Sequence, residues 1–473
     1  MNGPSLLLVV ADTTRADALG VAGSPLADAA RDGRTYVRAT SPAPWTPPAH
    51  ASMLTGLAPS EHGVWRANLF DDQGRPCPRP VRGAVAERWL PARLAAAGYR
   101  TLGISANPWV APYFGFDHGF ERFESLKDWG PRWANRSPSA RAARRLPAPL
   151  ARRLRRRRLA KRMRHGGPDS GAAHALRTMS AWLGESDRPF FAFLNLMEAH
   201  WPYRPPAGLE GFSPREARDA VDLLARLGQF KRFTLEAYFG RAELAPEERA
   251  ILRRLYLGEV AYLERRLVEL LDRLAAAGRL DDTVVVVVAD HGEQLGEHGL
   301  YGHGSSLYEQ LLHVPLLVLG PEELVGRGVE DARVSTQRLY DAMLAWAGCQ
   351  PASLRGDGPV VAEREGMWYQ PVVRRMPDAA PRKAELEANS WAVYRGDWKY
   401  VRDELGNEAY YDLAADPAET GNGEQASAAA PVDAMRRLLA ETLAARRPCL
   451  LAPAAAGEHD PSIEADLRAL GYL

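Results

Sequence analysis

Two uninterrupted apolar segments, each followed by an aspartate, restrict the fold of this chain more than any other feature. Residues 6–11 and 283–289 are built almost entirely from leucine, valine and alanine, and Asp12 and Asp290 follow them directly. A strand with one solvated face alternates apolar and polar residues, whereas a parallel strand covered on both faces is apolar throughout. In open α/β sheets, functional groups gather at the carboxyl ends of such strands. The sequence therefore predicts a mostly parallel sheet with its chemistry near Asp12 and Asp290.

The C-terminal part of the chain has a different pattern. Its apolar segments are short, alternate with polar residues and are bounded by turn residues, at 391–394, 398–401 and 409–413. This pattern predicts a small antiparallel sheet. We therefore expect an α/β fold in which residues 1–360 form a large mixed, mostly parallel sheet flanked by helices. Residues 361–473 are expected to form a smaller α+β subdomain.

The overall composition is that of a globular protein in a reducing compartment. The 473 residues are 46% hydrophobic and 25% charged, which is ordinary for a chain with a large core. The cysteines Cys77, Cys349 and Cys449 are far apart, so neither a disulfide framework nor a thiolate metal site is indicated. The first apolar segment lacks a basic flank, unlike a signal peptide, and no later segment is long enough to span a bilayer. We expect a soluble cytoplasmic protein.

Residues 44–56 have the sequence Pro-Trp-Thr-Pro-Pro-Ala-His-Ala-Ser-Met-Leu-Thr-Gly and predict a helix that begins near Thr46. Pro47 and Pro48 fit the first turn of a helix, and Gly56 is a typical helix stop. Backbone N–H groups and the positive end of the helix dipole would surround the Thr46 hydroxyl, which favours an anionic group there. The hydroxyl could then act as a nucleophile. Alternatively, Thr46 could serve only as the helix N-cap.

A candidate metal group follows the segment at residues 283–289. Asp290 and His291 are adjacent there, and Gly292 allows the backbone to turn. A carboxylate beside an imidazole at a strand end is a strong signal for two metal ligands. Asp12, at the end of the first strand, is a third candidate ligand, although an aspartate at that position could instead cap the following turn.

The order of these motifs along the chain resembles the sulfatase family of the alkaline phosphatase superfamily. Thr46 takes the position of the nucleophile, Pro48 that of the motif proline, and His50 that of the arginine in the family pattern Cys/Ser-x-Pro-x-Arg. Asp12 takes the position of the first metal ligand, and Thr13 replaces the second carboxylate. The resemblance implies that residues 1–360 are a sulfatase-like catalytic domain and that the substrate is an anionic ester.

The resemblance also implies a divalent metal ion. Its expected ligands are Asp12, Thr46, Asp290 and His291. The sulfatases commonly carry an Asp-Asn pair with a hard cation. The Asp-His pair resembles that of phosphonate monoester hydrolases and threonine-dependent transferases, and it suits Mn²⁺ or Zn²⁺ better. We expect Mn²⁺ or Zn²⁺, with Ca²⁺ or Mg²⁺ as alternatives.

Other residues at family positions complete the expected site. His200 lies in a segment that resembles a His-x-Pro-Tyr turn, and it could protonate the leaving group, bind substrate or be only structural. His303 takes the position of a lysine that holds the anion in sulfatases. Asn107 lies where sulfatases carry Gly-Lys-Trp-His, and it could bind an anion or cap a turn. The residues expected to be catalytic are Thr46, His200 and His303, and those expected to bind substrate are His50, Asn107, His200 and His303. Glu198, His200 and His303 could hold a second cation, as in two-metal phosphatases.

The resemblance and its departures together predict the reaction. Sulfatases convert a cysteine or serine into an aldehyde, which is hydrated, whereas Thr46 offers no route to that aldehyde. We therefore expect Thr46 to attack a phosphorus ester directly, either a phosphodiester or a phosphonate monoester, through a phospho-threonine intermediate that water or another alcohol resolves. The alternatives are a sulfatase that acts without formylglycine and a non-catalytic anion-binding protein.

A basic helical insertion is predicted at residues 139–166. The stretch from Arg141 to Arg164 contains twelve Arg or Lys residues and no acid, so the rest of the chain has a net charge of about −11 against a total of +1. The leucine spacing after Pro149 predicts an amphipathic helix. This helix could be merely solvated, or it could dock an anionic substrate, an anionic polymer or a lipid surface. Because no aromatic residues are interleaved, a nucleic-acid partner is the least favoured.

Overall fold

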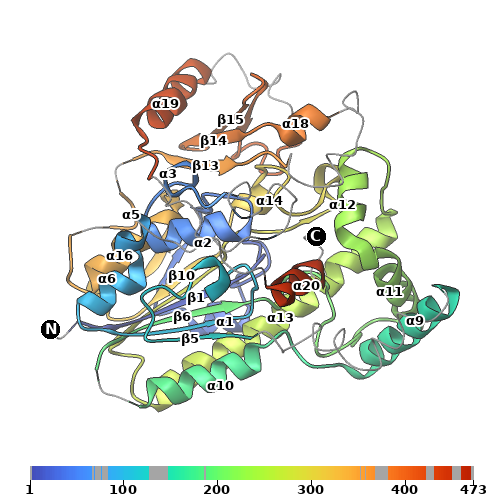
Figure 1. Cartoon of the computed structure of the whole chain (residues 1–473), viewed down its shortest axis with the longest axis horizontal. Helices are drawn as coiled ribbons and strands as arrows, with labels where there is room; N and C mark the ends of the chain where they lie inside the picture. The colour runs from blue at the N-terminus through green and yellow to red at the C-terminus, as the bar shows by residue number, and fades with distance from the viewer. Residues whose placement is uncertain are drawn as a thin grey trace.

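The computed structural model describes residues 3–65, 69, 76, 84–126, 148–185, 188–351, 353–356, 358–367, 382–421, 431–449 and 460–469. Its main sheet has eight strands in the order β11-β2-β10-β7-β1-β6-β4-β5 (Figure 1). The strands are β1 (Ser5–Ala11), β2 (Arg34–Tyr36), β4 (Arg100–Ser105), β5 (Arg122–Ser125), β6 (Phe190–Leu196), β7 (Thr283–Val288), β10 (Leu316–Leu319) and β11 (Gly328–Glu330). Only β10 runs antiparallel to its neighbours, which confirms the predicted mixed, mostly parallel sheet.

The two apolar segments form the central pair of this sheet. Strand β1 lies between β6 and β7, and all its residues are buried. Its alternate side chains enter two separate cores: Leu6, Leu8 and Val10 pack in one, and Leu7, Val9 and Ala11 in the other. This double burial explains why the segment shows no polar alternation. Because Val10 is paired with Val288, both strands end at the same edge of the sheet.

Helices cover both faces of the sheet. One core contains residues of α2 (Thr46–Thr55), α6 (Leu90–Ala96) and α16 (Leu339–Trp346). The other core contains residues of α10 (Ala172–Leu183), α11 (Pro214–Arg226) and the long α13 (Pro246–Ala276). In Figure 1, α9 (Ala148–His165) lies beside α11 at the lower right edge of the molecule, and α12 (Phe230–Tyr238) lies above α11.

The C-terminal sheet is antiparallel, as predicted. It consists of β13 (Val360–Arg364), β14 (Ser390–Arg395), β15 (Trp398–Asp403) and β16 (Glu408–Asp412), and α19 (Val432–Ala445) packs on one face. The buried Lys399 connects this sheet to the main domain, because its Nζ donates to Glu309 at 3.0 Å and to Glu419 at 2.7 Å. The chain then returns to the main core through α20 (Pro461–Ala469), whose Ile463 and Leu467 are buried there.

The remaining elements are short. The helices are α1 (Pro25–Ala29), α3 (Pro59–His62), α5 (Ala84–Arg88), α14 (Glu309–Leu312), α15 (Glu322–Val325) and α18 (Lys383–Glu387). The strands are β3 (Ala39–Thr40) with β12 (Val334–Ser335), and β8 (Gln294–Leu295) with β9 (Tyr301–Gly302). Across the described ranges, no helix combines the length and apolar character that a membrane crossing requires.

Candidate active site

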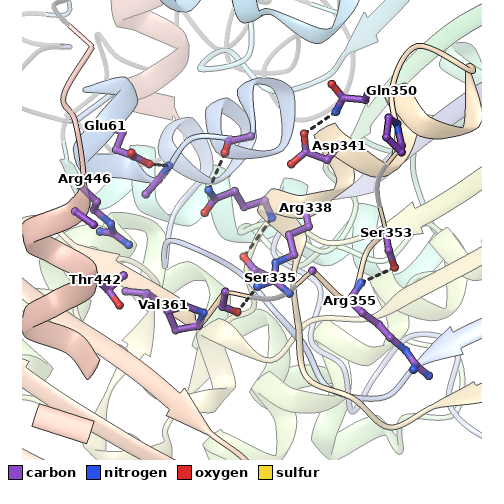
Figure 2. A pocket seen from close by; sticks show the side chains of 18 residues that line it. Glu61, Ser335, Arg338, Asp341, Gln350, Ser353, Arg355, Val361, Thr442 and Arg446 are labelled. Carbon is purple, nitrogen blue, oxygen red and sulfur yellow. Dashed lines mark hydrogen bonds between the residues drawn. The ribbon is translucent and has the colours of Figure 1, made fainter. Parts of the chain in front are cut away.

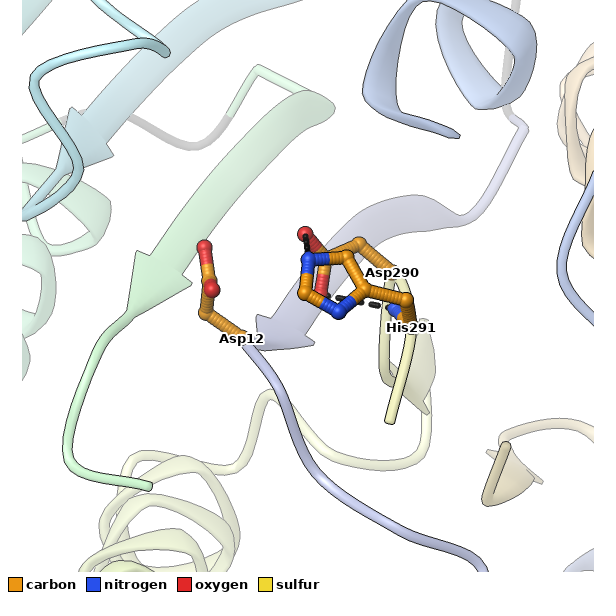
Figure 3. A group of neighbouring side chains, drawn as sticks. All are labelled: Asp12, Asp290 and His291. Carbon is orange, nitrogen blue, oxygen red and sulfur yellow. Dashed lines mark hydrogen bonds and ion pairs between the residues drawn. The ribbon is translucent and has the colours of Figure 1, made fainter. Parts of the chain in front are cut away.

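Three potential metal ligands meet where β1 and β7 end. Ligand atoms of Asp12, Asp290 and His291 all lie within 4.8 Å of one another, and the three residues are completely buried (Figure 3). The convergence follows from the topology, because neighbouring parallel strands present their carboxyl ends at one edge of the sheet. The structure thus brings together three of the residues that the sequence indicated as ligands.

Each carboxylate has one oxygen held by the protein and one left without a hydrogen-bond partner. Oδ2 of Asp12 accepts hydrogen bonds from Nδ2 of Asn107 at 2.7 Å and from Nδ2 of Asn195 at 3.2 Å. Oδ1 of Asp290 accepts from the backbone N–H of Thr13 at 3.1 Å and of His291 at 2.9 Å. Among the described residues, the other oxygens, Oδ1 of Asp12 and Oδ2 of Asp290, are buried and have no hydrogen bond of ordinary geometry, although two histidine nitrogens lie 3.4 Å from Oδ2 of Asp290.

The unpaired oxygens fit a divalent cation. Burial, together with the smaller repulsion from Asp290, raises the pKa of Asp12 to about 7. The pKa of Asp290 is also raised to about 7 by burial. Two buried carboxylates of like charge are costly unless a cation neutralises them. The group is therefore consistent with the metal site expected from the sequence.

The tautomer of His291 is fixed by its own loop. Its Nδ1 lies 2.8 Å from the backbone oxygen of Gly292, so Nδ1 carries the proton and Nε2 presents a lone pair. Nε2 lies 3.4 Å from Oδ2 of Asp290 and 3.3 Å from Oγ1 of Thr46. Nε2 of His291, the atom that could bind a metal, therefore faces both Oδ2 of Asp290 and the Thr46 hydroxyl.

Thr46 is the first residue of α2 rather than its N-cap. Trp45 occupies the cap position in an extended conformation, and its side chain makes no capping hydrogen bond. The two prolines lie in the first turn, and the helix ends at Gly56 with φ of 69°, as the sequence predicted. The Thr46 hydroxyl also interacts with the carboxylate of Asp290, where it lowers the pKa. The Thr46 hydroxyl is therefore free of a capping role and can face the metal group.

His50 lies one helical turn after Thr46 and contacts the same group. Its Nδ1 is 3.0 Å from the backbone oxygen of Thr46 and 3.4 Å from Oδ2 of Asp290, and its Nε2 is 3.1 Å from Nδ2 of Asn195. Burial lowers the pKa of His50 to about 3, so the imidazole is neutral. The structure therefore places His50 against Thr46 and Asp290, and Asn107 against Asp12, where the sequence suggested substrate contacts.

A turn with unusual backbone geometry shapes the floor of the site. Thr13 has φ of 57°, which is rare for a β-branched residue and marks local strain. The turn is held by Tyr256, whose hydroxyl donates to the backbone oxygen of Thr13 at 3.0 Å and accepts from the N–H of Arg15 at 2.9 Å. This geometry directs the N–H of Thr13 at Oδ1 of Asp290. The resemblance noted from the sequence implies that Thr13 stands in place of a carboxylate.

The two other predicted catalytic histidines also reach the site. The ring centroid of His303 is 4.5 Å from that of His291 and 5.3 Å from that of His200. Nδ1 of His200 lies 2.7 Å from the backbone oxygen of Trp201, which directs Nε2 away from that segment. Burial is the main cause that lowers the pKa of His200 to about 3, so it is neutral near pH 7.

Glu293 is a site residue that the sequence did not reveal. Its carboxylate is completely buried, and it accepts hydrogen bonds from His303 Nδ1 at 2.9 Å and from the Tyr203 hydroxyl at 2.8 Å. Burial raises the pKa of Glu293 to about 7. The only signal in the sequence was its position, three residues after Asp290. Asn195, at the end of β6, was also missed, because its position at a strand end was again the only signal in the sequence.

Glu198 points elsewhere. Its Oε1 accepts a hydrogen bond from the backbone N–H of Ala172 at 2.9 Å. Burial is the main cause that raises the pKa of Glu198 to about 7, and the nearby charge of Asp169 is the second cause. In the part of the chain that the structure describes, Asp12, Asp290 and His291 form the one group of three close metal-ligating side chains. A second cation at Glu198, His200 and His303 is therefore not indicated by this arrangement.

A cleft of about 1020 Å³ lies apart from the metal group, between the C-terminal end of α2, the start of α16 and α19. Figure 2 shows that both signs of charge line it, from Glu61 and Asp341 to Arg338, Arg355 and Arg446. None of the predicted site residues is among its lining residues.

Comparisons with known proteins identify the family of this chain. The family model described as Sulfatase matches residues 4–349. The chain belongs to the sulfatase family. Similar curated proteins are a choline-sulfatase of Rhizobium meliloti, 28% identical over 50% of this chain and 47% of its own length, and a sulfatase of Formosa agariphila, 24% identical over 87% and 80%. The match thus spans about half the length of the choline-sulfatase.

Solved structures show the same fold for this sulfatase-family protein. A phosphonate monoester hydrolase of Agrobacterium radiobacter superposes with a TM-score of 0.59 at 21% identity, covering 93% of this chain and 95% of its own. One from Silicibacter pomeroyi gives a TM-score of 0.60 at 19% identity, covering 93% and 95%. At this level of identity the likeness establishes the fold, while substrate and nucleophile require their own argument.

Proposed function

We propose that this sulfatase-family protein is a metal-dependent ester hydrolase or transferase that uses Thr46 as a direct nucleophile on a phosphorus ester, either a phosphodiester or a phosphonate monoester. The observation that carries the proposal is the position of Oγ1 of Thr46, 3.3 Å from Nε2 of His291 within the buried metal group. A threonine hydroxyl at the start of a helix, facing unpaired carboxylate oxygens, is suited to attack once it is activated.

The residues that would hold the metal are Asp12, Thr46, Asp290 and His291. Two carboxylates, a hydroxyl and an imidazole suit Mn²⁺ or Zn²⁺, which we favour over Ca²⁺ and Mg²⁺. When bound, such a cation lowers the pKa of the threonine hydroxyl and neutralises negative charge on the phosphoryl oxygens. Asn107, Asn195 and His50 act in this proposal as positioning residues for the carboxylates, in keeping with their hydrogen bonds and contacts.

In the first step Oγ1 of Thr46 attacks phosphorus, and the bond to the leaving oxygen breaks in line. The hydroxyl proton passes to the neighbouring carboxylate of Asp290. His303 donates the proton that the leaving oxygen needs, because its Nδ1 is held by Glu293 at 2.9 Å, which fixes the orientation of the imidazole. His200 is neutral and its Nδ1–H donates to the backbone oxygen of Trp201, so its Nε2 can only accept a hydrogen bond, such as one from the attacking water or alcohol.

In the second step water, or an alcohol in a transferase, attacks the phospho-threonine. His303, now deprotonated, takes the proton of the incoming nucleophile, and the bond between phosphorus and Oγ1 of Thr46 breaks. Thr46 recovers its proton and the phosphorylated product leaves. The two steps return every residue to its starting state.

Threonine is what favours phosphorus over sulfur. Thr46 occupies the position that carries Cys or Ser in sulfatases, and its methyl group prevents oxidation to the aldehyde on which those enzymes depend. His50 also replaces the arginine of the motif that is recognised for that conversion.

A sulfate ester is the second candidate substrate. The sequence similarity to a choline-sulfatase favours it. A sulfatase without the aldehyde would keep the fold and the metal group and would turn over aryl sulfate faster than any phosphorus ester. A non-catalytic anion-binding protein, the third alternative, would show no metal-dependent turnover at all.

The test is turnover of four p-nitrophenyl substrates: a phosphodiester, a phosphonate monoester, a phosphate monoester and a sulfate. Each is measured with Mn²⁺ or Zn²⁺ and after chelation, for the wild type and for Thr46→Ala. We expect phosphodiester or phosphonate turnover that needs metal and is lost in Thr46→Ala. Preference for the sulfate would favour the second candidate, and undiminished activity in Thr46→Ala would remove Thr46 as the nucleophile.

A further inference from the structure

The outer side of α9 carries a line of exposed cations that the site chemistry leaves unused. Four of them, Arg153, Arg157, Lys161 and Arg164, are all exposed, and we call them the basic stripe. Their spacing of four, four and three residues places them on one face of the helix. At a rise of about 1.5 Å per residue, the stripe is about 16 Å long.

Within the part of the chain that the structure describes, no acidic side chain pairs with the basic stripe. Among the described residues, no ion pair or hydrogen bond reaches any of the four side chains. The neighbouring Arg156 is different, because it forms an ion pair with Asp222 of α11. Arg156 therefore binds the neighbouring helix, whereas the basic stripe is exposed to solvent.

The opposite side of α9 fixes the helix to the main domain. Met163 is buried, and Leu159 packs against the same core. The C-terminal end of α9 is joined to the segment that follows His200: the N–H of Leu209 donates to the backbone oxygen of Met163 at 2.9 Å, and the N–H of Gly167 donates to that of Pro206 at 3.2 Å. The stripe therefore has a fixed position relative to the loop that carries His200.

The approach of these two segments depends on a glycine. Gly166 has φ of +72°, and a Cβ at this position would lie 2.2 Å from the backbone oxygen of Pro206. Such a contact is impossible for any other residue without backbone movement. The end of the basic helix is thus built to pack on the active-site segment.

We propose that the basic stripe docks a linear polymer of phosphate esters, one ester of which enters the active site. Cations repeated about every turn can engage several anionic units of one chain at once, whereas a small anion engages only one. Three of the four residues are arginines, which bind phosphate oxygens through two parallel hydrogen bonds. The choice of phosphate esters rests on the proposed function, because the active site is proposed to act on that bond.

Two other partners fit this surface less well. Insertion into a membrane needs an apolar face, but Leu150 is the one exposed large hydrophobic side chain on the part of α9 whose side chains are described. Recognition of nucleic-acid bases uses aromatic rings for stacking, and α9 contains no Phe, Tyr or Trp. The line of cations on α9 is suited to bind the charged backbone of a polyanion, whatever groups are attached to that backbone.

The experiment measures binding of a fluorescent abasic deoxyribose-phosphate oligomer, which is a chain of phosphodiesters without bases. Thr46→Ala is the background, so that the probe is not consumed. Four contacts predict that affinity falls about 50-fold between about 50 and 200 mM salt. Changing all four residues of the stripe to Gln should lower affinity at least tenfold at low salt and flatten this dependence. The matched control changes four exposed arginines on other elements to Gln, namely Arg93, Arg395, Arg402 and Arg437.

The control variant should bind the oligomer within twofold of its parent. Equal losses in the stripe and control variants would overturn the proposal, because net charge alone would then explain binding. So would tenfold tighter binding of ordinary DNA of equal length, which would indicate base recognition, or stripe-dependent binding of phosphatidylserine vesicles without oligomer binding, which would indicate a membrane partner.

A second readout separates this inference from the proposed function. With Thr46 restored, the stripe variant should turn over a small p-nitrophenyl phosphodiester at the wild-type rate, since the stripe lies outside the metal group. If the wild type shows no such turnover, the proposed function fails, and the binding result is judged independently. If both variants bind the oligomer normally while turnover is present, the docking surface fails and the proposed function stands.

Discussion

Raising the pH should destabilise the metal-free protein through Asp12 and Asp290. Burial raises the pKa of each from 3.8 to about 7 in the folded protein. A group whose pKa is raised by folding contributes stability that is complete below its unfolded pKa and is lost as the pH rises through its folded pKa. The loss should therefore occur between about pH 4 and pH 7.

The size of this effect follows from the width of that window. One pKa unit corresponds to about 1.4 kcal/mol, and about two pH units separate pH 5 from the folded pKa, so ionising one of these carboxyls costs about 3 kcal/mol between pH 5 and pH 8. At about 2.1 cal/mol/K per residue, a chain of 473 residues has an unfolding entropy of about 1 kcal/mol/K. The melting temperature should fall by about 3 °C for each such group.

Differential scanning fluorimetry of chelated protein at about pH 5 and pH 8 tests this expectation. Asp12→Asn removes one titrating carboxyl, so its decrease in melting temperature should be smaller than that of the wild type by about 3 °C. Adding Mn²⁺ at about a hundred times its Kd should raise the wild-type melting temperature by about 3 °C at pH 8, and by less at pH 5, where protons compete with the metal. Equal pH dependence in both proteins would refute the assignment of a buried, unneutralised carboxylate pair.

Three further predictions address the neighbours of the metal group. Glu293→Gln removes the anionic partner of His303, so kcat should fall about 100-fold for substrates with alkoxide leaving groups and much less for p-nitrophenyl esters; an equal fall for both classes would contradict the assignment of a general acid. Asn107→Ala removes the 2.7 Å donor to Asp12, and calorimetry should show metal affinity weakened about 10- to 100-fold; unchanged affinity would mean that Asn107 does not position this ligand. Chelation should abolish turnover and Mn²⁺ or Zn²⁺ should restore it, whereas activity that persists in chelator would exclude a metal-dependent reaction.

The parts of the structure that depend on local pattern were predictable from the sequence. The two apolar segments became β1 and β7, with their aspartates at the same sheet edge, because burial on both faces leaves an unmistakable composition. The prolines and Gly56 likewise marked the ends of α2. These signals lie within a few residues of one another, which is why one sequence is enough to read them.

Contacts between distant segments were not predictable in this way. Asn107 and His50 occupy positions that suggested substrate contact, but they contact Asp12 and Asp290 across long separations in the chain. Glu293 contacts His303 because the short hairpin of β8 and β9 brings the two residues together. The local composition of the sequence gives no sign of this contact. A family pattern identifies a position, but the fold decides which atom the side chain faces.

Other expectations stay predictions. A helix is present at residues 148–165, as expected after Pro149, whereas residues 139–147 and Cys77 lie outside the described residues. That residues 139–166 form an insertion stays a prediction. The division of the chain at residue 360 and the cytoplasmic location are not tested by the structure. The roles of the candidate catalytic residues depend on the experiments above.

The most direct test of the central claim is to identify the covalent intermediate. Wild-type protein with Mn²⁺ is mixed with p-nitrophenyl phenylphosphonate, quenched rapidly in acid, digested and mapped by mass spectrometry. The account predicts a phosphonyl adduct on the peptide that contains Thr46, formed at the rate of the p-nitrophenol burst and absent in Thr46→Ala. Steady turnover without an adduct, or an adduct on another residue, would show that Thr46 is not the nucleophile.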